Sequence, residues 1–199
     1  MEALETKEKI EETVERQHEL TQSRLRIGLL IAALAALLAI METGGKSAQT
    51  DAVNANLRAS NLWAFFQAKT ARMTTIRTAA ETANLALSID LPLATKEIIQ
   101  KQIDAWNAIA ARYESEPETK EGRKELTERA REAETERDHK LTAYHLFEFG
   151  SASAQLAIVL ASAAIITGFM FFVYLAGALG IISFALGVMA WLAPTTLHL

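Results

Sequence analysis

The chain has 199 residues, of which 50% are hydrophobic, and a formal net charge of −4 at neutral pH. Acidic and basic residues alternate in its charged stretches, whereas binding to nucleic acid requires basic residues clustered in one patch. We therefore expect no nucleic-acid partner. The absence of cysteine excludes disulfide bonds, thiol catalysis and thiolate metal sites.

Charged and apolar residues are separated along the chain. No Asp, Glu, Lys or Arg lies in residues 149–197, while more than half of residues 114–140 are charged. A helix of a soluble protein needs both an apolar and a polar face, so this separation indicates two different solvents. The sequence predicts an all-α integral membrane protein with three transmembrane helices and a long antiparallel, coiled-coil-like helical hairpin outside the bilayer.

The first transmembrane helix is predicted at residues 27–41, after a charged N-terminal amphipathic segment at residues 1–26. Such a helix measures about 22 Å, against about 30 Å for the hydrocarbon core of a bilayer. The stems of Arg24 and Arg26 can supply the difference, because their charged heads reach the lipid phosphates. A cleavable signal peptide is the alternative, although the segment before the apolar run is long and rich in acidic residues.

Residues 42–150 are predicted to form the hairpin, with a turn near residues 88–94. Its first helix carries a row of residues at three-four spacing that includes a single polar side chain, which is the pattern of a coiled-coil seam. Gly44 and Gly45 are a candidate kink between the first span and this helix. The row, which we call the seam and expect to pack against another helix or another copy, consists of Ala52, Ala55, Ala59, Leu62, Phe66, Lys69, Met73, Ile76, Ala80, Ala83 and Leu87.

Lys69 is the polar member of the seam and has two interpretations. It lies at the edge with its head in water, or it fixes the register or the number of helices that associate. A further break is predicted near residues 114–118, where Ser115 and Glu118 have the spacing of a capping box that starts a helix. Residues 118–140 form the returning helix of the hairpin or, alternatively, a solvated single helix held by charge pairs four residues apart.

The last apolar run, residues 152–193, would measure about 63 Å as one helix, which is twice the thickness of a bilayer core. Glycines predict its turn at residues 175–180 and therefore two spans, at residues 151–174 and 177–193. Small residues spaced four apart let membrane helices approach closely. The residues predicted to make such helix contacts are Gly28, Ala32, Ala36, Ala157, Ala161 and Gly168.

No catalytic, cofactor-binding or metal site is predicted. Glu15 with His18 and Glu136 with His139 match the Glu-x-x-His unit that di-iron helical bundles use twice, but neither pair lies on an apolar face that could bury a metal. No charged residue lies inside a span, which disfavours an active transporter. We therefore expect a protein that is not an enzyme and needs no cofactor.

Three segments together resemble a known family: residues 61–70 (NLWAFFQAKT), residues 113–126 (YESEPE followed by GRKEL) and residues 155–167 (QLAIVLASAAIIT). They are similar to a family of bacterial membrane proteins labelled domain of unknown function 4337, and the resemblance covers nearly the whole chain. It implies a bacterial inner-membrane protein, and it brings no activity or site residues with it.

The expected function is that of a multi-pass inner-membrane scaffold whose partners are the lipid bilayer and further copies of itself. We expect a homo-oligomer because the sequence has several faces suited to helix packing and no group of residues suited to catalysis. An oligomeric ion or small-solute channel is the alternative, and a metal-dependent ferritin-like enzyme the third. Arg16, Arg24 and Arg26 favour a cytoplasmic N-terminus, and the inverted orientation stays open.

Overall fold

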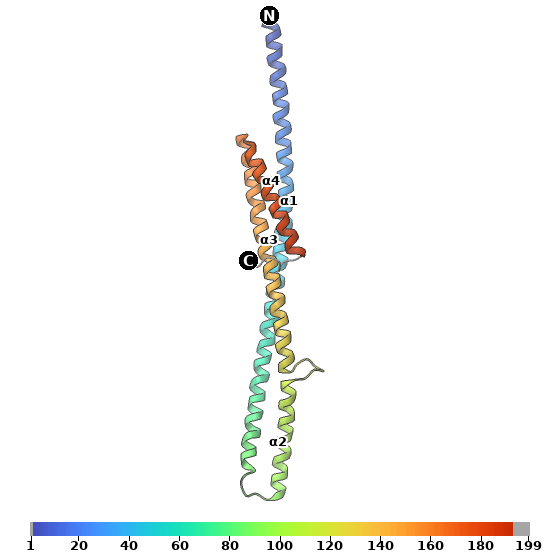
Figure 1. The fold of residues 1–199 in the computed structure, drawn as a ribbon, viewed down its shortest axis with the longest axis vertical. Coiled ribbons are helices and arrows are strands. Elements are labelled where there is room, and N and C mark those ends of the chain that lie inside the picture. Colours follow the sequence, from blue (N-terminus) through green and yellow to red (C-terminus); the bar gives the residue numbers. More distant parts are fainter. Residues whose placement is uncertain (1, 193–199) are drawn as a thin grey trace. The chain divides into compact units, whose positions relative to one another are not determined.

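A computed structural model describes the backbone of residues 2–192 and the side chains of residues 21–192. Over the described residues the chain forms four helices and no strand (Figure 1). The prediction of an all-α chain is thus confirmed for this part of the protein. The helices are α1 (Glu2–Ala86), α2 (Leu93–Glu114), α3 (Arg123–Thr167) and α4 (Met170–Leu192).

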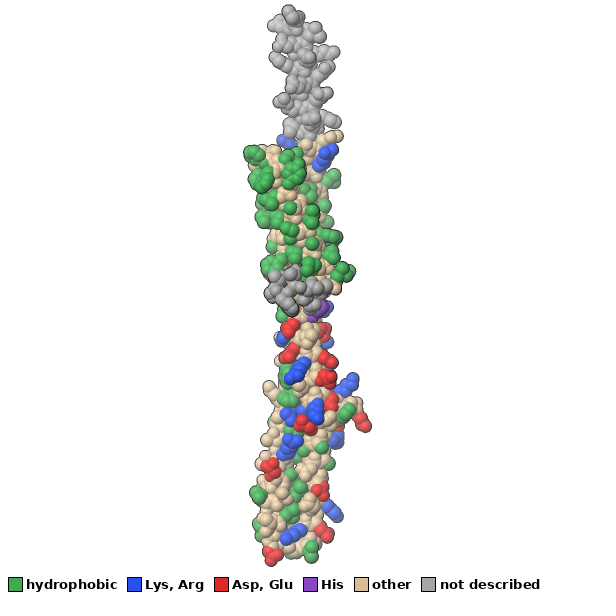
Figure 2. Space-filling view, viewed as in Figure 1, with side chains coloured by type: hydrophobic (Ala, Val, Ile, Leu, Met, Phe, Trp, Pro, Cys, Tyr) green, Lys and Arg blue, Asp and Glu red, His purple; other side chains and the backbone are tan. Residues whose placement is uncertain are grey.

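The chain divides into two compact units. We call Asp51–Asp138 the charged unit, and the residues up to Thr50 together with those from His139 onward the apolar unit. Helices α1 and α3 contribute to both units, whereas α2 belongs to the charged unit and α4 to the apolar unit. Figure 2 shows hydrophobic side chains over the surface of the apolar unit and acidic and basic side chains over the charged unit.

Helix α1 continues without interruption through Gly44 and Gly45, the candidate kink. No proline precedes Pro92, and the helix is rich in alanine and leucine, which favour helix formation. Gly44 serves packing instead. A β-carbon added at Gly44 would lie 2.7 Å from Cε1 of Phe147, so a larger residue there would require this ring to shift.

Helices α1, α3 and α4 each contain a stretch that is long and apolar enough to cross a membrane. They pack together through two apolar clusters. One is centred on Leu34, Ala157 and Ala161, and the other on Met41 and Leu146. Many large apolar side chains nevertheless face outward, as the exposure of Leu29 (72%) and Ile181 (71%) illustrates. Apolar surface on the outside is what a bilayer requires and water disfavours.

The turn between the last two spans lies at Gly168 and Phe169, and the prediction of a turn at residues 175–180 is wrong. Gly168 has a φ of +73°, a conformation that costs other residues energy because their β-carbon crowds the backbone. The glycine at position 180 packs instead, since a β-carbon there would lie 2.7 Å from Cδ2 of Leu34. The last span is therefore α4, whose 23 residues measure about 34 Å, and α3 ends seven residues earlier than residue 174.

In the charged unit, α1 and α3 are joined by contacts whose residue numbers rise along one helix and fall along the other. Arg58 pairs with Glu136 at 2.8 Å, and the indole N–H of Trp63 donates to Glu134 at 2.8 Å.

Between α1 and α2, Pro92 immediately precedes the first residue of α2 with a ψ of 143°. Proline disfavours a helical conformation in the residue before it and lacks an N–H, so the chain turns here before α2 begins.

Residues 115–122 connect α2 to α3, and the predicted capping box is wrong. Ser115 follows the last residue of α2 in an extended conformation instead of starting a helix, and α3 begins only at Arg123. The Ser115 hydroxyl donates to Glu125 at 2.6 Å, and the same carboxylate accepts the backbone N–H of Glu116 at 3.2 Å. Ser115 and Glu118 have the spacing of a capping box. The hydroxyl of Ser115 and the N–H of Glu116 are nevertheless bound by Glu125, which belongs to α3.

Candidate functional site

Lys69 of the charged unit is a basic residue whose side chain is buried. Its ammonium lies 3.5 Å from Glu116 and 3.8 Å from Glu121, both in the connection between α2 and α3. A buried charge is tolerated only when it is paired. We call this group of side chains the lysine clasp; it comprises Lys69, Glu114, Ser115, Glu116, Glu121, Arg123 and Glu125.

Two aromatic rings complete the surroundings of the lysine. The ammonium lies 5.4 Å from the ring centre of Phe65 and 5.5 Å from that of Tyr113, within the range of cation–π attraction. The interpretation in which Lys69 extends into water is therefore wrong. The remaining interpretation, in which the lysine fixes helix register, agrees with these contacts, because a charged head in a closed cage has one position along the helix.

Arg123 forms the second half of the clasp at the first turn of α3. Its guanidinium donates to Glu114 at 2.8 Å and to the Thr70 hydroxyl at 2.9 Å, and it lies 4.9 Å from the ring centre of Phe66. These contacts join the end of α2, the start of α3 and the middle of α1. A planar guanidinium can bind acceptors in its plane while its face stacks on a ring.

Two carboxyl groups of the clasp are held in their charged form. The Arg112 guanidinium, 2.6 Å away, lowers the pKa of Glu116 below its ordinary value, and the Ser115 hydroxyl does the same to the pKa of Glu125. Hydrogen bonds to the ionised form produce both shifts. Glu116 and Glu125 are therefore ionised at neutral pH, and the clasp joins carboxylates and basic side chains from α1, α3 and the connection between α2 and α3. Such an arrangement positions helices.

Every predicted member of the seam is buried or half-buried within the chain. The most deeply buried are Ala52, Ala55 and Ala59, and Met73 and Ala80 are also below one-tenth exposed. The phase of the seam was therefore predicted correctly. The helices that cover it belong to this chain, so its burial does not require a second copy.

The predicted helix contacts of the spans fall into two groups. Ala157 and Ala161 of α3 are fully buried in the core of the apolar unit. Gly28 has nothing within 4 Å of the place a β-carbon would take, and Gly168 lies in the turn with equally open space, so on that side neither packs against another helix among the described residues. Ala32 and Ala36 are likewise exposed. Gly180 and Gly187 of α4, which were not predicted, face Leu34 and Met41 of α1 instead.

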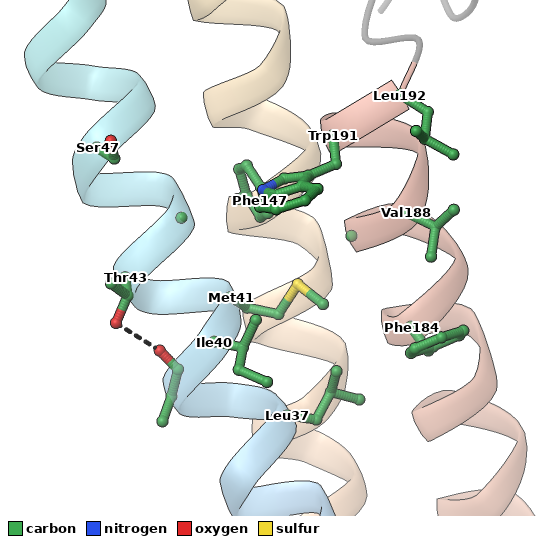
Figure 3. Close-up of a pocket in the computed structure, with 13 residues that line it drawn as sticks. Leu37, Ile40, Met41, Thr43, Ser47, Phe147, Phe184, Val188, Trp191 and Leu192 are labelled. Atoms are coloured by element: carbon green, nitrogen blue, oxygen red, sulfur yellow. Dashed lines mark hydrogen bonds between the residues drawn. The ribbon is translucent and has the colours of Figure 1, made fainter.

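An apolar groove opens on the surface of the apolar unit, with a volume of about 800 Å³ (Figure 3). Helix α1 forms one wall and α4 the other, and Phe147 of α3 lies between them. Leu37 and Phe184 lie at one end of the groove, and Ser47 and Trp191 at the other. The sequence alone did not reveal this groove, because it depends on how three helices diverge.

Among residues 21–192, no three His, Asp or Glu side chains lie close enough together to hold a metal ion. This includes Glu136 and His139, and Glu136 is instead paired with Arg58. Glu15 and His18 lie outside the residues whose side chains are described.

The outward face of α1 in the charged unit was also missed by the sequence analysis. It carries a second row at three-four spacing, which we call the outer row; every member is exposed and none is charged. On α3, by contrast, seven of the eight exposed residues between Arg123 and Asp138 are charged, and Thr135 is the exception. The outer row consists of Val53, Leu57, Ser60, Ala64, Ala68, Ala71, Thr75, Thr78, Thr82 and Leu85.

The fold and its outward apolar surface define a helical membrane protein with three candidate spans and a charged helical unit inserted between the first and second. Residues 23–193 match the family described as a domain of unknown function (DUF4337), and the chain belongs to that family. No curated protein and no solved structure matches the chain.

Proposed function

We propose that the protein is a non-enzymatic, homo-oligomeric scaffold of the bacterial inner membrane. In this proposal α1, α3 and α4 cross the bilayer, and the charged unit stands outside it as an antiparallel, coiled-coil-like hairpin. The observation that supports the proposal most strongly is the uncharged outer row of α1. It lies on the surface of a unit whose helix α3 exposes mainly charged residues.

The outer row has the properties of a contact surface between helices. The exposed outer positions of a helix in water are normally polar or charged, because these positions do not pack. Ala64, Ala68 and Ala71 are small enough to let another backbone approach closely. The hydroxyls of Thr75 and Thr82 donate to carbonyls of their own helix, at 3.0 and 2.8 Å. Their hydrogen-bond donors are therefore satisfied without water, and they can be buried in a contact.

A second copy of the same helix is the occupant that this chemistry favours. An uncharged row of small residues is self-complementary, so two copies related by a twofold or a higher rotation can present it to each other without repelling charges. The charged surface of α3 would repel a copy of itself or need a partner of matching charge pattern. We therefore place the contact between copies on α1.

Disulfide trapping tests this assignment directly, because the chain has no cysteine of its own. We expect Ala71→Cys in native membranes to form a cross-linked dimer under mild oxidation, since packed small residues bring Cα atoms within the roughly 4.4–6.8 Å that a disulfide requires. Thr135→Cys is the matched control, because it is an exposed, uncharged residue on α3.

A particle that is strictly monomeric in mild detergent, with no cross-link at Ala71 or Ala64, would refute the proposal. We also expect Ala68→Glu to reduce the oligomer, because it buries an unpaired carboxylate in the contact. Cross-linking at Thr135 with none at Ala71 would move the interface to α3 and would equally contradict the outer row.

The alternative of an oligomeric channel finds less support. A pore formed by several copies would need polar groups along a span, and the hydroxyls of Ser162 and Thr167 on α3 are candidates. Each donates at 2.8 Å to a carbonyl of its own helix. A hydroxyl engaged in this way still has lone pairs for an ion, but it does not project as a selective ligand. Ion flux through reconstituted vesicles that Ser162→Phe abolishes would reverse this preference.

A further inference from the structure

We propose that the apolar groove is a binding site for a single phospholipid, with one acyl chain in the groove and the phosphate at its Ser47 end. This inference depends on the groove lying in the bilayer and is independent of whether copies of the chain associate.

The position of the groove favours a lipid over other apolar molecules. Its walls come from α1 and α4, which are both apolar enough to span a membrane, so in a bilayer the apolar part of its open side would face lipid chains. Along α1 the lining extends from Leu37 to Ser47, which is about 15 Å of helix. The part from Leu37 to Met41 lies in the apolar run of the first span, and the part from Thr43 to Ser47 follows the exposed Glu42 and would lie at the level of the headgroups.

The groove also has the polarity of a lipid along its length. Leu37 and Phe184 close the deep end with apolar groups only. The other end lies beside the last turn of α4, where Trp191 is 82% exposed and Ser47 is exposed as well. An indole N–H and a hydroxyl at the level of the headgroups are the donors that phosphate and ester oxygens accept.

The charges at this mouth are balanced. Lys46, next to Ser47, adds an ammonium that can pair with a phosphate, and Glu42 stands one turn before it on the same helix. Both are exposed. A phosphate placed between Ser47 and Trp191 would be closer to the lysine than to the glutamate along the helix. A volume of about 800 Å³ is also in the range typical of small-molecule sites.

The test measures the retention of lipid by the full chain in detergent. The delipidated protein is incubated with phosphatidylglycerol or with diacylglycerol of the same acyl chains, and bound lipid is counted by native mass spectrometry. We expect about one phosphatidylglycerol per chain at saturation, and weaker retention of diacylglycerol, because only the phosphate can use the donors at the mouth.

Two substitutions fill the groove from opposite walls. Ala39→Phe on α1 and Val188→Phe on α4 are both expected to reduce bound phosphatidylglycerol to the detergent background. Ala35→Phe is the matched control, since it is an exposed alanine one turn away on α1 that does not line the groove. Ser47→Ala combined with Trp191→Phe should lower phosphatidylglycerol retention to the level of diacylglycerol.

Several results would overturn the proposal. The first is no retained lipid in the unaltered chain, and the second is equal retention in the Ala39→Phe and Ala35→Phe variants. If removal of residues 193–199 raises lipid binding severalfold, the end of the chain occupies the groove. If Ala39→Phe lowers the mass of the particle by whole subunits, a second copy occupies it.

Discussion

The buried lysine of the clasp allows the contributions of its stem and its charge to be separated. Lys69→Met keeps an apolar side chain of similar length and removes the ammonium. Lys69→Ala removes both. Because Glu116 also binds Arg112 and Glu121 is half-exposed, neither carboxylate is left isolated when the ammonium is lost. Removing the charge therefore costs the free energy of two ring contacts and two long ion pairs. Part of this cost is offset because the methionine variant no longer has to bury a cation.

Each ring contact contributes about 0.5–1 kcal/mol, and the relief of desolvation offsets part of it. We expect Lys69→Met to lower the free energy of unfolding by about 1 kcal/mol. Lys69→Ala also removes three buried methylenes at about 0.8 kcal/mol each, so its total is about 3 kcal/mol. The stem of the lysine should thus stabilise the charged unit more than its charge does.

The measurement is urea unfolding of the full chain in detergent, followed by tryptophan fluorescence. In a Trp191→Phe background, the remaining indoles are Trp63 and Trp106, and both lie in the charged unit. Helicity by circular dichroism shows whether each variant folds. If Lys69→Met lowers the free energy of unfolding as much as Lys69→Ala does, the charge of Lys69 contributes more than its stem. That result would refute the expected order.

Three further predictions concern packing, pH and the turn. Leu126→Ala, at a fully buried position, should lower the free energy of unfolding by about 3–5 kcal/mol because of the cavity it leaves, whereas Leu141→Ala, at a 37% exposed position, should cost much less; equal effects in urea unfolding would contradict the described core. The folded-state pKa values of Glu116 and Glu125 lie below the ordinary value of 4.5, so the stability they contribute is complete above about pH 4.5 and is lost as the pH falls through the lower folded values. The free energy of unfolding measured against pH should show this loss, and the loss should be smaller in Glu125→Gln. If the pH profile of that variant is unchanged, the Glu125 carboxylate does not contribute to the pH dependence. Gly168→Val should cost more than Gly168→Asn in thermal unfolding, since asparagine tolerates positive φ and a β-branched residue does not, and equal melting temperatures would place the turn elsewhere.

Periodicity in the sequence predicted the faces of helices well. The seam from Ala52 to Leu87 follows from three-four spacing alone, and its members are buried or half-buried. Composition alone also indicated three apolar stretches, each of which lies in a helix long enough to cross a membrane. These features are local to one helix, and a helix repeats its geometry regularly enough for the sequence to determine which residues share a face.

Features that depend on contacts between helices were predicted poorly. Gly44, Gly168 and Gly180 look alike in the sequence, yet one accommodates a ring, one adopts a positive φ and one packs against a leucine. The predicted turn followed a cluster of glycines, although the resulting last span was only about 25 Å long. Comparing span lengths would have favoured a turn at Gly168. The partner of Ser115 could not be predicted from local spacing, because Glu125 reaches it from the following helix.

The two connections of the charged unit differ in how they would accept an inserted sequence. Between α2 and α3, Glu125 and Lys69 bind the connecting residues, and Gly122 has no room for even a methyl group beside Glu116. The connection between α1 and α2 makes only short-range bonds, such as that from the Ser88 hydroxyl to the carbonyl of Leu85. An epitope tag or protease site at Asp90 should therefore report which side of the membrane it faces while leaving the native fold intact.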